Sequence, residues 1–250
     1  MRALLLLSAA AVLLHSAVFE VQYAVSFWFL GRIGTTTMHF ESADGRYRIE
    51  ANATLEGIAA LIAHHHSEHY VSSGHIADDG TLIPKRYDVT KILDDYRSIR
   101  HYYFDRRHRR ILLQQQTERT VSERRFDIDS MQFDTKRRLK KSAFVRLEPF
   151  YAENDLLSLY FNVRNVLGTL KASEQLQLSA VGARNGEVHI SRQNGMYDFF
   201  VYLDQDIFRS KEGKLFVQTD RDLYVKSAVM KDVLLFGDLD VEREWLRQSP

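Results

Sequence analysis

The sequence predicts a mainly β protein. We expect a single curved antiparallel sheet or an open β-barrel of about ten or eleven strands, with one short helix and one longer helix packed on it or in it. Three observations predict this class. Apolar and polar residues alternate with a period of two along most of the chain, glycine-containing turn pairs separate these runs, and only two segments show helical spacing.

The first residues, MRALLLLSAAAVLLHSA, have the pattern of a secretory signal peptide, in which Arg2 precedes an apolar run and small residues follow. The run is short for a membrane span, although an uncleaved anchor is the alternative. Cleavage after Ala17 would divide the chain into a signal peptide, residues 1–17, and one β-rich domain, residues 18–250. No linker rich in proline, glycine or serine divides the second part.

The chain contains no cysteine. An exported protein of this sequence therefore has no disulfides and lacks the residue that bacterial lipidation requires. We expect a periplasmic protein without a lipid anchor. Loss of Arg2 with the signal peptide would leave 33 basic and 33 acidic residues. This balance indicates no particular partner, and export argues against nucleic acid.

The expected strands begin with VQYAVSFWFL, residues 21–30, and continue with residues 35–40 and 47–55. Each run puts apolar side chains on one face, because successive side chains of a strand point to opposite sides. The pair Asp44-Gly45 between the last two runs is a strong hairpin signal. Further alternating runs are residues 97–104, 111–113, 124–134, 186–192, 197–203, 214–220 and 222–229.

Two segments predict helices. GIAALIAHHH, from Gly57, indicates a short apolar helix, and NDLLSLYFNVRNVLG, residues 154–168, indicates a longer one. Asn154 is a suitable N-cap and Gly168 a suitable C-terminal residue. The apolar side chains of the longer segment recur at helical spacing along one face.

Several short motifs occur in order over most of the chain after the signal peptide. They are GRIG (31–34), YRIEANATLEG (47–57), YVSSG (70–74), LIPKRY (82–87), YYFD (102–105) and DLLSLYFNVR (155–164). In this succession the chain resembles DUF3108, a bacterial family of exported domains without an assigned function. The resemblance implies an exported β-rich domain and a fold similar to the open, helix-plugged barrels of the lipoprotein carriers LolA and LolB. It implies no catalytic residues.

A set of mostly aromatic side chains faces one side of the expected strands. A sheet that curls more widely than its side chains can fill would leave an apolar pocket for a lipid or an acyl chain, whereas a filled sheet would make the same residues ordinary core. The candidate ligand-binding residues are Tyr23, Phe27, Phe29, Tyr103, Tyr197, Phe199 and Val201.

Histidines gather between the short helix and the YVSSG motif, at residues 64–69. If the helix continues through this stretch, His65 and His69 lie one turn apart and could share a zinc ion with Glu68 nearby. The metalloprotease spacing H-E-x-x-H is absent. A helix that ends earlier leaves an exposed polar turn instead. We therefore predict no metal site, with His65 and His69 as the alternative.

Two basic clusters flank expected strands and could contact an anionic membrane surface or an envelope protein, or simply be solvated. They comprise Arg106, Arg107, Arg109, Arg110, Lys136, Arg137, Arg138, Lys140 and Lys141.

The sequence contains no G-x-S-x-G elbow, no cysteine and no glycine-rich phosphate loop. We therefore predict no catalytic residues and no cofactor. The expected function is that of a non-enzymatic periplasmic protein that binds an apolar ligand, such as a lipid or acyl chain, or assists envelope assembly. The alternatives are a metal-dependent hydrolase that uses the histidines at 64–69, and a structural partner in an envelope complex.

Overall fold

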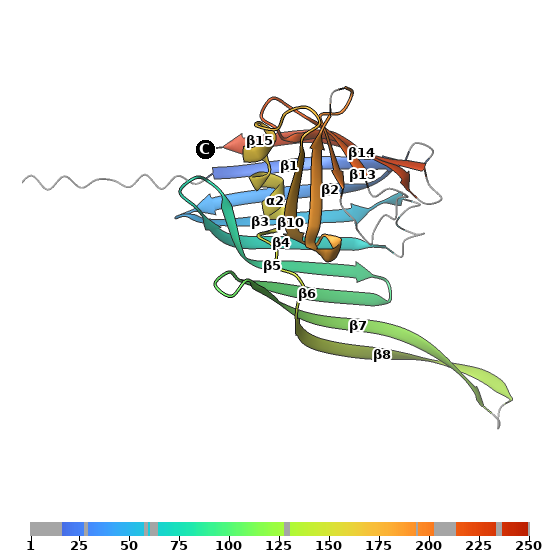
Figure 1. Cartoon of the computed structure of the whole chain (residues 1–250). Helices are drawn as coiled ribbons and strands as arrows, with labels where there is room; N and C mark the ends of the chain where they lie inside the picture. Colours follow the sequence, from blue (N-terminus) through green and yellow to red (C-terminus); the bar gives the residue numbers. More distant parts are fainter. Residues whose placement is uncertain are drawn as a thin grey trace, which may run out of the picture.

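The computed structural model describes residues 17–27, 30–57, 60, 65–127, 131–193, 195–202, 214–233 and 237–249. Within them the chain forms one open sheet of 15 strands (Figure 1). The strands are β1 (Ala17–Phe27), β2 (Gly31–Ala43), β3 (Arg46–Leu55), β4 (Ser67–Ile76), β5 (Leu82–Leu93), β6 (Tyr96–Asp105), β7 (Arg110–Asp127), β8 (Gln132–Leu147), β9 (Asn154–Asp155), β10 (Gln175–Val181), β11 (Glu187–Arg192), β12 (Phe199–Tyr202), β13 (Lys214–Thr219), β14 (Val225–Val233) and β15 (Gly237–Ser249).

The expectation of ten or eleven strands with two helices is wrong. Alternation misses β8 because its residues 135–147 are exposed on both faces, so no apolar face marks the strand. The single run expected at residues 124–134 is the far end of a hairpin, where β7 ends at Asp127 and β8 begins at Gln132. β4 and β5 also lack strict alternation of apolar and polar residues.

With the exception of β8 and β9, strands that follow one another in the chain lie next to one another in the sheet. The order is β8 to β1, then β15 down to β9, so that β1 pairs with β15 in the middle of the sheet. All pairs are antiparallel except the short parallel pair of β9 with β10. The two edges, β8 and β9, are connected in the chain by residues 148–153.

The turn between β2 and β3 has the expected hairpin chemistry. Asp44 and Gly45 both have positive φ, 53° and 67°, as a two-residue turn that matches strand twist requires. The pairing that follows is continuous from Ala43 with Arg46 to Gly34 with Leu55. The sequence pattern and the turn therefore specify the same register.

A short helical segment lies against the concave side of the sheet. It consists of α2 (Leu156–Asn162) and α3 (Arg164–Leu167), joined at Val163. Figure 1 shows α2 between the long layer of β1–β8 and the strands β10–β13, which curl over the same face. α2 contacts β3, β4 and β5 on one side and β9 and β10 on the other.

The N-cap of α2 is Asp155, and the expected N-cap, Asn154, belongs to β9. The side chain of Asp155 accepts hydrogen bonds from the backbone N–H groups of Leu157 and Ser158, both at 2.9 Å, and Ser158 Oγ accepts a hydrogen bond from Asp155 N at 3.0 Å. This is a capping box. The short helix expected from Gly57 lies mostly outside the described residues.

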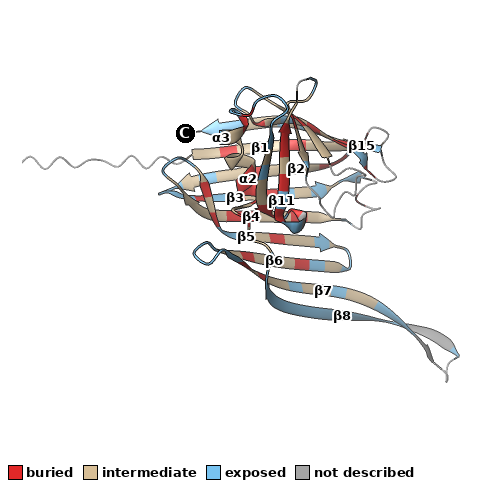
Figure 2. Cartoon of the chain, in the orientation of Figure 1, coloured by how far each residue is buried: buried red, intermediate tan, exposed pale blue. Residues whose placement is uncertain are grey.

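The helix divides the buried core in two. Leu157 packs with Val21, Ile49 and Tyr87 of the long layer, all nearly or fully buried. Leu159 packs with the core of the curled strands, together with Val188, Ile190, Phe199 and Val217. Figure 2 shows buried residues on the strands around α2, while residues 135–147 of β8 are exposed. Within the described ranges, no helix combines the length and the apolar character that crossing a membrane requires.

Candidate functional site

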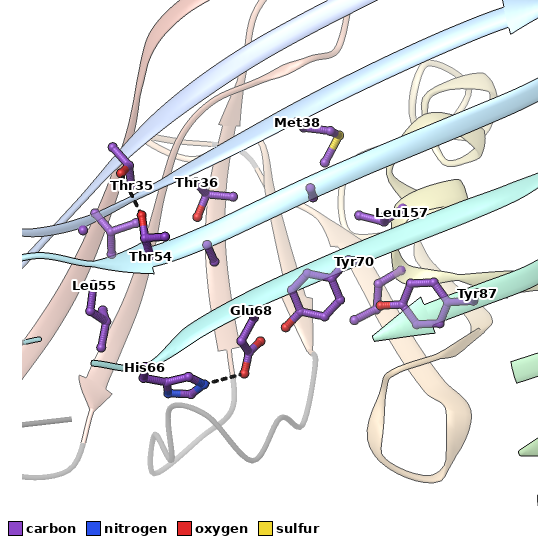
Figure 3. Close-up of a pocket in the computed structure, with 15 residues that line it drawn as sticks. Thr35, Thr36, Met38, Thr54, Leu55, His66, Glu68, Tyr70, Tyr87 and Leu157 are labelled. Atoms are coloured by element: carbon purple, nitrogen blue, oxygen red, sulfur yellow. Dashed lines mark hydrogen bonds and ion pairs between the residues drawn. The ribbon is translucent and has the colours of Figure 1, made fainter. Parts of the chain in front are cut away.

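The candidate site is an apolar cavity of about 290 Å³ between β2–β4 and the start of α2 (Figure 3). Its volume lies near the lower end of the range for small-molecule pockets, roughly 300–1,000 Å³. The lining residues are Val25, Gly34, Thr35, Thr36, Met38, Ala51, Ala53, Thr54, Leu55, His66, Glu68, Tyr70, Tyr87, Leu156 and Leu157.

Small side chains on β3 leave the space that forms the cavity. Register places Met38 opposite Ala51, and Thr36 opposite Ala53, on the concave face. Alanine fills much less volume there than the aromatic and branched residues on neighbouring strands, so the sheet and the helix do not close completely. The apolar floor of the cavity is therefore a direct result of the alternation in YRIEANATL, in which the two inward residues that follow Ile49, Ala51 and Ala53, are small.

A buried polar contact fixes the helix above this floor. Ser72 Oγ of β4 donates to Asp155 Oδ2 at 2.7 Å, and Tyr47 Oη lies 3.2 Å from the same serine oxygen. Asp155 and Ser72 are fully buried. Burial raises the pKa of Asp155 to about 6, although the hydrogen bonds from Ser72, Ser158 and Leu157 act to lower it.

Two further contacts hold the helix. Asn162 Nδ2 donates to Leu82 O at 2.8 Å, and Leu82 N donates to Asn162 Oδ1 at 2.7 Å, so the end of α2 is attached to β5. Tyr160 Oη lies 2.7 Å from Tyr23 Oη on β1, and burial raises the pKa of Tyr160 to about 12. Both phenols therefore stay protonated at neutral pH and keep this contact.

At one end of the cavity, Glu68 forms an ionic cluster with His66 and Lys91. Figure 3 shows Glu68 and His66. Glu68 Oε1 lies 2.8 Å from His66 Nε2 and 2.8 Å from Lys91 Nζ. Burial alone would raise the pKa of Glu68, but the hydrogen bond from His66 and the charge of Lys91 outweigh it and lower the pKa below its usual value. The carboxylate is thus ionised and paired, and the middle of the cavity remains apolar.

The candidate ligand-binding residues from the sequence do not form one site. Tyr23 is buried in the core beside α2, and Phe27 is buried in a separate cluster near the ends of β2 and β14. Phe199 and Val201 pack in the core of the curled strands. Phe29 lies outside the described residues.

Tyr103 and Tyr197 lie elsewhere. The guanidinium of Arg86 lies 5.5 Å from the centre of the Tyr103 ring, and Tyr197 packs against Phe216 at 5.3 Å between ring centres. Of the seven candidates, none of those described lines the cavity. The signal that could have located the cavity is the pair of inward alanines on β3, because small inward residues leave room where large ones fill it.

The histidines face different directions. β4 begins at Ser67, so His65 and His69 do not share a helix turn. His65 Nδ1 lies 2.9 Å from Asp94 Oδ1, and His69 Nδ1 lies 2.7 Å from Asn52 Oδ1. His64 lies outside the described residues, and no group of three or more potential metal ligands gathers among those described.

The two basic clusters differ in their surroundings. At the turn between β6 and β7, Arg106 and Arg109 both reach Glu153, at 3.0 and 3.5 Å, and Arg110 lies 3.6 Å from Asp105. The second cluster lies on β8, the strand at one edge of the sheet. Its residues are Lys136, Arg137, Arg138, Lys140 and Lys141, all exposed.

Comparison with protein-family models, with curated proteins and with solved structures finds no match to this chain.

Proposed function

We propose that this protein is a non-enzymatic periplasmic binding protein that holds an apolar ligand, such as an acyl chain, in the cavity between β2–β4 and α2. The periplasmic location rests on the signal-peptide pattern of residues 1–17, with residues 18–250 as the single exported domain. The resemblance to the DUF3108 family supports the same location.

The observation that carries the proposal is the cavity lining. Met38, Ala51, Ala53, Leu55 and Leu157 present apolar surface around a volume of about 290 Å³. Burial of an apolar ligand there would contribute about 25 cal/mol for each Å² removed from water, before the costs of association. The ionic cluster at one end pairs its charges internally, so an apolar segment can lie beside it without leaving a charge unpaired.

The test fills the cavity. Replacement of Ala53 by phenylalanine puts an aromatic ring where the ligand would lie, so binding of a fluorescent long-chain fatty acid should fall at least about tenfold. The matched control is Asn52→Phe, on the neighbouring position of β3 whose side chain points to the other face and is exposed. This variant should bind the fatty acid as the unchanged protein does.

Circular dichroism and thermal unfolding establish that both variants fold. Native mass spectrometry of the gently purified protein, with and without added lipid extract, provides a second measurement that needs no substitution. A protein that takes up neither the fatty acid nor any component of the extract would contradict the proposal. The structural-partner alternative would then explain the cavity as a packing defect.

A further inference from the structure

We propose that the projecting ribbon, defined as residues 120–127 of β7, the turn residue Met131 and residues 132–139 of β8, attaches the protein to an anionic lipid bilayer through β8. This inference concerns a surface distant from the cavity, and it does not depend on the proposed ligand. β6 pairs with β7 only from Arg110 to Arg119. From Thr120 onward β7 pairs with β8 alone, so the two strands leave the body of the sheet as a ribbon (Figure 1).

The ribbon buries little. Residues 122–124, 131 and 135–139 are exposed, Thr120 and Val121 are partly buried, and the exposure continues along β8 to Leu147 (Figure 2). A two-stranded ribbon in water is marginally stable by itself, and none of the ribbon residues whose burial the structure describes is buried. The stability of the fold therefore gives no reason for its length, whereas a contact beyond the body of the protein does.

The outer strand is strongly basic. KRRLKK, residues 136–141, has five cations in six positions, and no acidic residue occurs between Thr135 and Leu147. Glu118 and Glu123 of β7 compensate in part, through Lys141 at 2.6 Å and Lys140 at 3.3 Å. Arg137 and Arg138 make no ion pair with a described residue. As neighbours on a strand they point to opposite faces, so each face of the ribbon carries a cation that no described carboxylate pairs with.

The mixture of charge and apolar surface favours a bilayer over an acidic protein. Met131 and Leu139 are exposed by 72% and 52% and lie within the same stretch as the cations. At a membrane interface, arginine and lysine reach the head groups while neighbouring apolar side chains enter the acyl boundary. Cations on both faces suit a ribbon surrounded by head groups. A protein partner would neutralise one face and leave the other.

The other basic cluster provides an internal comparison. Glu153 and Asp105 pair with arginines at the β6–β7 turn, and the ring of Tyr151 lies 4.7 Å below the guanidinium of Arg109. That turn contributes a similar formal charge, but Arg106, Arg109 and Arg110 are engaged with the protein's own groups. A double substitution there changes the total charge of the protein by the same amount as one on the ribbon.

The experiment measures co-sedimentation of the purified protein with vesicles. Phosphatidylcholine vesicles that contain phosphatidylglycerol should bind the protein at low salt, and high salt or pure phosphatidylcholine should abolish binding. The double variant Arg137→Gln/Arg138→Gln should weaken binding roughly 25-fold, about fivefold for each cation removed. The control, Arg106→Gln/Arg109→Gln, removes two arginines that already pair with Glu153 and should weaken binding no more than about threefold.

The ribbon variant removes no described ion pair, so its thermal midpoint should match that of the unchanged protein. The cavity variant Ala53→Phe should sediment with vesicles normally, which separates this proposal from the ligand-binding proposal. Equal loss in the two double variants, or equal binding to neutral and anionic vesicles, would overturn the inference. Binding to polyglutamate without binding to vesicles would also overturn it and would assign the ribbon to an acidic protein partner.

Discussion

Asp155 joins the helix, the sheet and the cavity, and its environment makes stability depend on pH. Burial raises its pKa to about 6 in the folded protein, whereas a carboxyl in the unfolded chain titrates near 3.9. Between roughly pH 4 and 6 the folded state therefore binds more protons than the unfolded state. Stability from this group is greatest when it is protonated, and it is lost as the pH rises through 6.

Asp155→Asn should remove this dependence. Asparagine keeps the acceptor for the N–H groups of Leu157 and Ser158, and its amide can donate to Ser72 Oγ. Relative to the unchanged protein, the variant should gain about 3 kcal/mol of unfolding free energy between pH 4 and pH 7, at about 1.4 kcal/mol per pKa unit. Denaturant titrations at several pH values measure this difference.

Asp155→Ala is the control, because it removes the acceptor together with the charge. It should show the same pH-dependent gain, shifted to lower stability by about 1 kcal/mol for the lost cap. A difference between Asp155→Asn and the unchanged protein that does not vary with pH would contradict this account of the buried carboxyl.

At the level of single residues, the sequence predicts the helix but places its start one residue too early. Asn154 and Asp155 are both good N-caps, and only Asp155 is followed three residues later by a serine that completes the capping box. The inward alanines of β3 were visible as part of an alternating strand. That they line a cavity depends on where α2 lies, and no local pattern contains that information.

At the level of elements, the bulge between β4 and β5 explains why YVSSG ends in glycine. The register shifts between Ser73 and Gly74, where Gly74 lies opposite Pro84, a fully buried residue without a backbone N–H. A Cβ on Gly74 would lie 1.9 Å from Ile83 O. The two backbones approach too closely for any side chain at this position.

Gly74→Ala should therefore destabilise the protein by about 1–3 kcal/mol or more, since a backbone must move to make room. Gly168→Ala is the matched control. Gly168 has φ −63°, and an added Cβ would meet only Leu223 Cδ1, at 3.5 Å. That substitution should be neutral or stabilise by up to about 1 kcal/mol. Urea titration of both variants measures the contrast, and equal effects would refute the close-approach explanation.

The strands that could be predicted from the sequence are those with one face buried and the other exposed to solvent. β3 shows this alternation and was found, whereas β8 is exposed on both faces and was joined to the end of β7 as one run. A strand that contributes nothing to the core has no apolar periodicity to reveal it. The strands that are hardest to predict from the sequence are thus those, such as β8, whose two faces are both exposed to solvent.

For the whole molecule, the central position of β15 makes it indispensable. It pairs with β1 on one side and with β14 on the other. Deletion of residues 237–249 would expose two long edges at once, and we expect aggregation on size-exclusion chromatography. Replacement of residues 121–138 by a two-residue turn should leave a monomer with an unchanged thermal midpoint. A stable monomer without β15 would show that the two halves do not need each other.

The mainly β character follows from period-two alternation along most of the chain. The strand order does not, because alternation reports which face is buried and never which strand is next to which. The pairing of Val21 with Leu246 and the opening between β8 and β9 result from the folded arrangement as a whole.

The pairing of β1 with β15 also affects the order of events during folding. Residues such as Val18 and Ser249 become neighbours only after nearly the whole chain is available. Closing so distant a contact is slow, and until it forms the hydrogen-bonding groups along β1 are open to any passing strand. A newly made chain would thus pass through a vulnerable interval in which a holding chaperone, by covering that first strand, would prevent irreversible association.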